Sequence, residues 1–288
     1  MRLYPECVPC MLKQALEMAK LVTHDRKVLE RVLRAGLGIL QSERWNVPQP
    51  IVAFKLFRKV SELIGVEDPY REIKRQSNRF VMNLYDELEG IIESSKDKLM
   101  TAIKLSIAGN IIDYGTGRPF DVDETINRVL RTDFTINHYK LLREDIEKAE
   151  TIVIFGDNAG EAVFDKLLIE QLGDKKITYF VRAHPFINDV TVIDAEEISL
   201  GDIAEIKEVR FGDWDRGMSI DEAVRFAKKS DLIISKGQGN FELLSGYDAK
   251  IYFLFIVKCD VIARAVNAPI GSQILLLNQK YRGSLKGF

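Results

Sequence analysis

The residues best suited to chemistry lie in the stretch Thr151 to Glu161, which reads TIVIFGDNAGE. Its first five residues are β-branched or aromatic and predict a strand buried on both faces, which stops at Gly156 before a helical pattern begins. Asp157 and Asn158 follow, and their carboxylate and amide oxygens suit magnesium, manganese or a similar divalent ion. The competing interpretation is an Asx-type helix start that binds no ligand.

Small residues in the same stretch indicate a place where a ligand can approach the backbone. Gly156, Ala159 and Gly160 carry little or no side chain, and the first N–H groups of a helix favour an anion. We therefore expect these three residues to bind a phosphate group.

A second polar pair, Asn188 and Asp189, follows the strand expected over Ile177 to Val181. In the simplest topology this strand lies beside the first, so Asp189 becomes a third oxygen ligand next to Asp157 and Asn158. A polar turn between two strands is the alternative, because a further strand is expected over residues 189–193.

Two more strand ends place lysines near the same edge of the sheet. Ile233-Ile234-Ser235 leads into Lys236, and Gly237, Gly239 and Asn240 form a turn whose N–H groups can cradle phosphate oxygens. The spacing differs from the GxxxxGK[ST] pattern of a nucleotide loop, so ATP binding is not inferred. Lys258 ends the next apolar run; it either surfaces there or forms a two-cation clamp with Lys236.

The elements that must position these residues fall into two parts. Apolar residues at helical spacing predict helices over 7–22, 26–40, 51–64, 70–92 and 98–113, with shorter helices between 121 and 150. Strands are then expected over 151–155, 177–181, 189–193, 208–211, 231–235, 251–257 and 274–277, with helices such as 162–172 and 220–229 between them. We predict a helical region over 1–120 that caps the site and an α/β region over 121–288, or one compact unit.

Composition limits the classes of partner. The 288 residues include 41 basic and 43 acidic side chains, so a formal net charge of -2 points to neither nucleic acid nor an anionic membrane. The first residues lack a signal-peptide core, and we expect a cytoplasmic protein of unknown oligomeric state. Three cysteines argue against a disulfide framework; Cys7 and Cys10 form a CxxC pair that packs a helix, acts in redox chemistry or provides half a metal site.

Together these residues predict a site for a small phosphorylated metabolite. Two carboxylates and an amide would hold a divalent ion, and two lysines would offset charge on the phosphoryl oxygens, which favours hydrolysis of a phosphomonoester. His184 and Glu242 are the candidates for the general acid, and Asp157 or a water is the nucleophile. An S-adenosylmethionine-dependent methyltransferase and a non-catalytic phosphometabolite-binding protein are the alternatives.

The motifs GDNAGE, INDVT, SKGQGNFE and VKC, with AGNIID upstream, resemble the family first catalogued as domain of unknown function 89, the damage-control phosphatases. The amino-terminal CVPC resembles the microbial branch with a cysteine pair. The resemblance spans most of the chain and implies a helical amino-terminal region on a Rossmann-like three-layer α/β/α sandwich with a mainly parallel sheet.

The resemblance also implies roles for residues. Asp157, Asn158 and Asp189 would hold a divalent metal such as manganese, nickel, cobalt or magnesium, with Lys236 and Lys258 near the phosphate. Taken alone, Asn110 and Asp113 share a helix face and favour a buried structural hydrogen bond, but Asn110 lies in the AGNIID motif and joins the phosphate-binding candidates.

Overall fold

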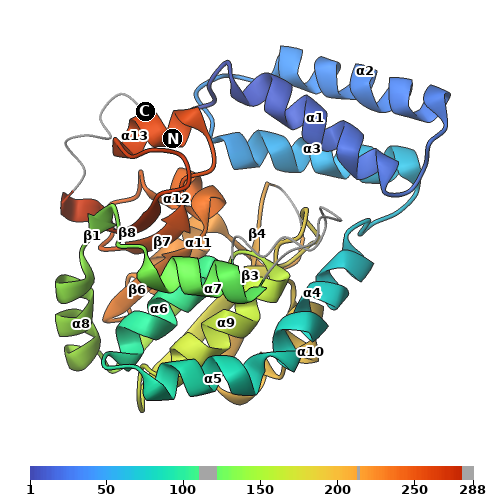
Figure 1. Ribbon diagram of the computed structural model, residues 1–288. Coiled ribbons are helices and arrows are strands. Elements are labelled where there is room, and N and C mark those ends of the chain that lie inside the picture. The colour runs from blue at the N-terminus through green and yellow to red at the C-terminus, as the bar shows by residue number, and fades with distance from the viewer. Residues whose placement is uncertain (110–121, 213–214, 281–288) are drawn as a thin grey trace.

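The computed structural model describes residues 1–109, 122–212 and 215–280, arranged as Figure 1 shows. Within these residues eight strands form one sheet in the order β1-β8-β7-β6-β2-β3-β4-β5, and all neighbours are parallel except β7 and β8. The strands are β1 (Ile136–Asn137), β2 (Thr151–Phe155), β3 (Lys176–Arg182), β4 (Glu205–Arg210), β5 (Met218–Ser219), β6 (Leu232–Lys236), β7 (Tyr252–Ile256) and β8 (Gln273–Leu277).

Helices surround this sheet. Figure 1 shows α1, α2 and α3 side by side as a layer at one end of the molecule, whereas α4 and α6 pack against α9. The described α-helices are α1 (Cys7–Lys20), α2 (Arg26–Ser42), α3 (Gln49–Ile64), α4 (Arg71–Asn83), α5 (Tyr85–Ser94), α6 (Lys98–Ala108), α7 (Val122–Arg131), α8 (Tyr139–Lys148), α9 (Ala159–Glu170), α10 (Val192–Glu197), α11 (Ile220–Ala227), α12 (Gln238–Leu244) and α13 (Asp260–Val266). The described residues also include the 3-10 helices η2 (Leu200–Asp202) and η3 (Asn278–Lys280).

Two hydrophobic cores lie on the two faces of the sheet. Because side chains alternate along a strand, Val153 and Phe155 of β2 join the core formed with α1, α3, α12 and α13. Ile152 and Ile154 face the other way and join the core formed with α6 and α9. All four are at most 2% exposed, which confirms that β2 is buried on both faces. The α/β/α sandwich with a mainly parallel sheet is likewise confirmed.

Most predicted elements are present with shifts of a few residues, but the strand over 189–193 is wrong. Residue Thr191 instead caps α10: its backbone N–H and hydroxyl donate to Asp194 Oδ2 over 2.9 and 2.6 Å. This reciprocal cap favours a helix start over an extended chain. The two-residue strands β1 and β5 were not predicted, because they are too short to show an alternating pattern.

The long helix predicted over 70–92 is also wrong, since it divides at Leu84 into α4 and α5. Each half has its own partner: α4 packs on α9, and α5 packs on α6. In α4, the fully buried ammonium of Lys74 lies 2.8 Å from Asp68 and 2.9 Å from Asp194. The contact with Asp194 ties α4 to α10, the helix that follows β3 in the chain. The predicted boundary between regions 1–120 and 121–288 stays a prediction.

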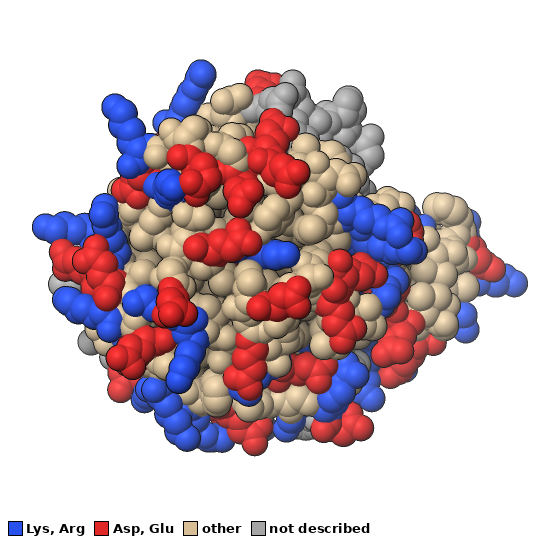
Figure 2. All heavy atoms as spheres, turned by 90° about the horizontal axis from the view of Figure 1, so that it is seen from below, with Lys and Arg blue, Asp and Glu red and all other residues tan. Residues whose placement is uncertain are grey.

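The surface carries charges of both signs. On the face shown in Figure 2, lysine and arginine side chains are interspersed with aspartate and glutamate. This face therefore presents no field of a single sign. Among the described helices, none combines the length and the apolar character needed to cross a bilayer.

Candidate active site

Two loops beyond the ends of β2 and β3 are joined through their backbones. Val190 N–H donates to the carbonyl of Asp157 over 2.8 Å, and Ala159 N–H donates to the carbonyl of Asn188 over 2.9 Å. Asn158 also forms an isolated antiparallel β-bridge with Asp189. These bonds place the predicted metal ligands side by side although about 30 residues of chain separate them. The three residues are Asp157, Asn158 and Asp189.

All three line a cavity of about 670 Å³, which is within the size range of small-molecule sites. Its inner wall comes from the loops after β2 and β3 and from α4, which contributes Lys74 and Ser77. Its outer wall comes from α1, from α12 and from the loop after β7. The polar and sulfur-bearing outer-wall residues used below are Cys7, Cys10, Gln238, Glu242, Lys258 and Cys259.

Asp189 is held by an arginine that we did not predict as a site residue. The Arg182 Nε donates to Asp189 Oδ2 over 2.6 Å, and its guanidinium lies 4.4 Å from the centre of the Phe211 ring. Burial raises the pKa of Asp189 to about 6, because desolvation outweighs the attraction of Arg182 and Asp157 adds repulsion. An arginine that ends a buried strand was the signal in the sequence. Asp189 is thus positioned for a cationic ligand on its cavity side.

Asn240 braces three strand ends instead of lining the cavity. Its Oδ1 accepts from Arg182 over 2.8 Å, and its Nδ2 donates to the carbonyls of Gly156 and Lys236 over 2.8 and 2.9 Å. Because Asn240 is 1% exposed and its amide is used in this way, the expected phosphate contact is corrected to a structural one. The Gly156 N–H is also used, since it donates to Phe180 over 3.0 Å.

The space beside the Gly237 Cα is occupied by the Asp157 carboxylate, whereas we expected a phosphate there. Its φ of 77° lies in the left-handed region, and a Cβ there would sit 1.9 Å from Asp157 Oδ2. A glycine is therefore required for the carboxylate to reach its position. Among the remaining small residues expected at the phosphate, Ala159, Gly160 and Gly239 do line the cavity.

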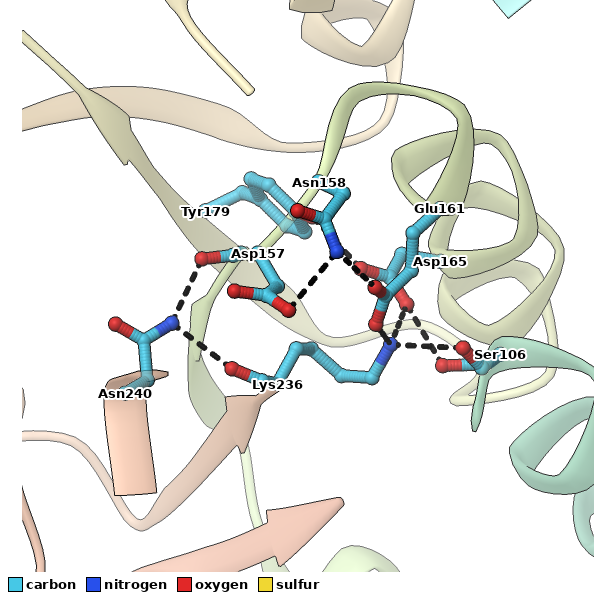
Figure 3. Close-up of polar contacts among 9 residues, drawn as sticks. Ser106, Asp157, Asn158, Glu161, Asp165, Tyr179, Lys236 and Asn240 are labelled. Atoms are coloured by element: carbon cyan, nitrogen blue, oxygen red, sulfur yellow. Dashed lines mark hydrogen bonds and ion pairs between the residues drawn. The ribbon is translucent and has the colours of Figure 1, made fainter. Parts of the chain in front are cut away.

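Lys236 lies behind the cavity wall, which differs from the expected direct contact with phosphate. Its ammonium is 2.6 Å from Glu161 Oε1, 2.6 Å from Asp165 Oδ1 and 3.0 Å from the Ser106 carbonyl, as Figure 3 shows. Its side chain has no exposed area, because two acidic residues of α9 enclose it. Burial would lower the pKa of Lys236, but Asp165 and Glu161 outweigh that effect and raise it. Glu161 and Asp165 were missed, although two acidic residues four apart in an apolar helix share a face.

The donor set fits a divalent ion. Two buried carboxylates, 8% and 7% exposed, come from Asp157 and Asp189, and Asn158 adds an amide. Within residues 1–109, 122–212 and 215–280, no three His, Cys, Asp or Glu side chains converge as a metal-binding group. Four carboxylates and two cations lie in and behind this part of the cavity wall. They are Asp157, Glu161, Asp165, Asp189, Arg182 and Lys236.

The outer wall carries the second predicted lysine. Lys258 is exposed and lines the cavity, while its backbone N–H donates to Gln238 Oε1 over 2.8 Å. Gln238 Nε2 also donates to Glu242 Oε1 over 3.1 Å. Burial raises the pKa of Glu242 to about 7, so this carboxyl is partly protonated near neutral pH. Glu242 thus lines the cavity with a carboxyl group that can carry a proton near neutral pH.

The other candidate residues from the sequence lie in different places. His184 lies outside the described cavity lining, and burial together with Arg216 lowers its pKa to about 4, so it is neutral at neutral pH. Asn110 lies outside the described residues. Cys7 and Cys10 line the outer wall, where Cys259 joins them from the other end of the chain, and all three are free.

Comparison with known proteins shows which family the chain resembles. Residues 3–274 match the family model described as the damage-control phosphatase ARMT1-like domain. The chain is 30% identical to damage-control phosphatase PH1575 of Pyrococcus horikoshii, covering 97% of this chain and 99% of that protein. It is 32% identical to a damage-control phosphatase of Archaeoglobus fulgidus, covering 95% and 98%. A crystal structure of a DUF89 family protein from Pyrococcus horikoshii has a TM-score of 0.86 at 29% identity, covering 96% and 99%. These matches confirm the resemblance in the motifs and the phosphatase role it implies: the chain belongs to the damage-control phosphatase family.

Proposed function

We propose that the protein is a divalent-metal-dependent phosphatase that hydrolyses small phosphometabolites such as sugar phosphates or damaged and side-product phosphate esters. The observation that supports this most is the arrangement of one cavity. Two carboxylates and an amide, from Asp157, Asp189 and Asn158, line its inner wall, and the exposed Lys258 lines its outer wall. A phosphate group between the walls would meet both.

The residues divide the work of hydrolysis. Asp157, Asn158 and Asp189 would hold manganese, nickel, cobalt or magnesium, which when bound polarises a phosphoryl oxygen and favours attack on phosphorus. Lys258 offsets negative charge on the phosphoryl oxygens. Glu242 donates a proton to the leaving oxygen, because its raised pKa of about 7 keeps a proton available. Arg182 keeps the Asp189 carboxylate turned toward the cavity.

The size and lining of the cavity support the substrate class. A volume of about 670 Å³ accommodates a molecule larger than inorganic phosphate. Amide side chains of Gln14, Gln49 and Gln238 line it and can hydrogen-bond hydroxyl groups. We also place the chain on the microbial branch of the family because of its Cys7 and Cys10 pair.

Phosphate release from p-nitrophenyl phosphate and a panel of sugar phosphates tests the proposal. We expect release with added Mn²⁺, Ni²⁺, Co²⁺ or Mg²⁺ and its loss after chelation. Asp157→Ala and Asp189→Ala should each lower the rate by at least about 10²-fold, because each removes a metal ligand. Full activity in either folded variant would refute the metal-site assignment. A binding protein without catalysis would bind sugar phosphates and release no phosphate.

A further inference from the structure

We propose that Glu161 is a positioning residue that, anchored by Lys236, turns the side-chain oxygen of Asn158 toward the metal. The inference rests on the proposed metal-dependent function and adds a residue to it. Glu161 lines the cavity wall yet is 1% exposed, and it contacts Asn158 directly. It therefore acts on the reaction through Asn158.

The orientation of the Asn158 amide follows from its partners. Asn158 Nδ2 donates to Asp157 Oδ2 over 3.0 Å and to Glu161 Oε2 over 3.2 Å (Figure 3). Carboxylate oxygens accept hydrogen bonds, so these two contacts assign the NH₂ to the side that faces Asp157 and Glu161 and the amide oxygen to the other side. Both N–H donors are thereby used. The amide oxygen then points away from the two carboxylates and is the atom left for a cation.

Glu161 can hold this amide because its own position is fixed. Its Oε2 accepts from Asn158, while its Oε1 accepts from Lys236 Nζ over 2.6 Å. Both carboxylate oxygens are needed, since each one accepts from a different donor. A glutamine at this position would offer a single acceptor and would place an NH₂ against one of the two donors.

Lys236 is saturated by protein groups. An ammonium has three N–H donors, and the three Lys236 contacts with Glu161, Asp165 and the Ser106 carbonyl use all of them. None remains for a substrate phosphate. Lys236 is thus the internal counter-ion of the α9 carboxylates. This role explains why the Lys236 ammonium is buried near the proposed phosphate site and does not contact the cavity.

The far end of the network is anchored in two other elements. Asp165 accepts at Oδ1 from the Ser106 hydroxyl of α6 and at Oδ2 from the Tyr179 hydroxyl of β3, both over 2.7 Å. The chain of bonds therefore runs from α6 and β3 through Asp165, Lys236 and Glu161 to Asn158. Fully satisfied buried networks hold their members in one geometry, and partners behind metal ligands tune affinity.

Two isosteric variants separate hydrogen bonding from charge. Glu161→Gln and Asp165→Asn each remove one negative charge beside Lys236, but only Glu161 contacts Asn158. With Mn²⁺ as the probe and free Mn²⁺ measured by electron paramagnetic resonance, we expect Glu161→Gln to weaken binding about 10–100-fold. Asp165→Asn should weaken it less than about threefold while lowering the melting temperature. Equal weakening in the two variants would show a charge effect and overturn the proposal.

A double-mutant cycle with Asn158→Ala gives a second readout, which a loss of folding would not imitate. If Glu161 acts through Asn158, Glu161→Gln should have less than about a twofold effect on Mn²⁺ affinity once Asn158 is alanine. The same loss in both backgrounds would overturn the positioning role. If the wild-type protein releases phosphate and binds Mn²⁺, and Glu161→Gln binds Mn²⁺ with the same affinity, this inference alone is refuted. Wild-type protein that binds no Mn²⁺ would refute the proposed metal dependence as well.

Discussion

Lys236 ends β6 and Lys258 follows the end of the neighbouring parallel strand β7, yet the two lysines lie in opposite environments. Lys236 has no exposed side-chain area and is enclosed by Glu161 and Asp165 of α9. Lys258 is exposed on the outer wall, where the protein holds its backbone through Gln238. The difference lies in what covers each strand end: α9 closes over β6, whereas the end of β7 opens into the cavity. The lysine behind the inner wall is therefore fixed by protein groups, whereas the lysine on the outer wall is available to a ligand.

Removing each ammonium group in turn tests the difference between Lys236 and Lys258 most strongly. Lys236→Met leaves two buried carboxylates without their counter-ion and should lower the free energy of unfolding by about 3–5 kcal/mol. Lys258→Met should change it by less than about 0.5 kcal/mol, since the side chain is solvated. Denaturant unfolding of both variants measures these values. Lys258→Met should instead weaken inhibition by inorganic phosphate about tenfold, and equal stability losses in the two variants would refute the contrast.

Two glycines, Gly237 directly after β6 and Gly239 in the first turn of α12, allow a smaller test. Gly237→Ala would force a Cβ to within 1.9 Å of Asp157 Oδ2 at a φ of 77°, and we expect a loss of about 3 kcal/mol. Gly239→Ala is the matched control, because nothing lies within 4 Å of its Cβ. Its stability should stay within about 0.5 kcal/mol of wild type. Thermal unfolding distinguishes the two, and a tolerated Gly237→Ala would contradict the close packing of the inner wall.

The smallest expected effect concerns Glu242 on the outer wall and depends on pH. Burial raises its pKa from 4.5 to about 7, and Gln238 and the amino terminus oppose the shift. The unfolded chain therefore ionises first, so the destabilising contribution is absent below 4.5, grows as pH rises from 4.5 to about 7 and stays constant above that. Glu242→Gln removes this pH-dependent contribution. We expect the free energy of unfolding of the variant to exceed that of wild type by about 2 kcal/mol over that range. Unfolding measured across this pH range checks the sign, and a constant difference would refute it.

The strand ends could be predicted from sequence because apolar runs and the residues after them are local signals. The runs before Gly156, Arg182, Lys236 and Lys258 gave the positions of four strands and the side chains that follow them. Parallel neighbours then bring those ends to one edge, which placed Asp157 beside Asp189. The resemblance to a phosphatase family added the activity.

The environment of each residue could not be predicted in the same way, because it depends on segments distant in the chain. Nothing near Lys236 announces that Asp165, 71 residues earlier, will reach its ammonium. Similarly, Cys259 gives no sign that Cys7 lines the same cavity. The strand expected over 189–193 was lost to a reciprocal cap between Thr191 and Asp194, whose spacing was legible but competed with an apolar pattern.

Anomalous diffraction from crystals containing Mn²⁺ and inorganic phosphate tests the central claim most directly. The account predicts one manganese peak bonded to oxygens of Asp157, Asn158 and Asp189, with phosphate between it and the Lys258 ammonium. The Lys236 ammonium should remain bonded to Glu161 and Asp165. A manganese peak on the outer wall beside Cys7 and Cys259, or a phosphate bonded to Lys236, would contradict the assignment of the two walls.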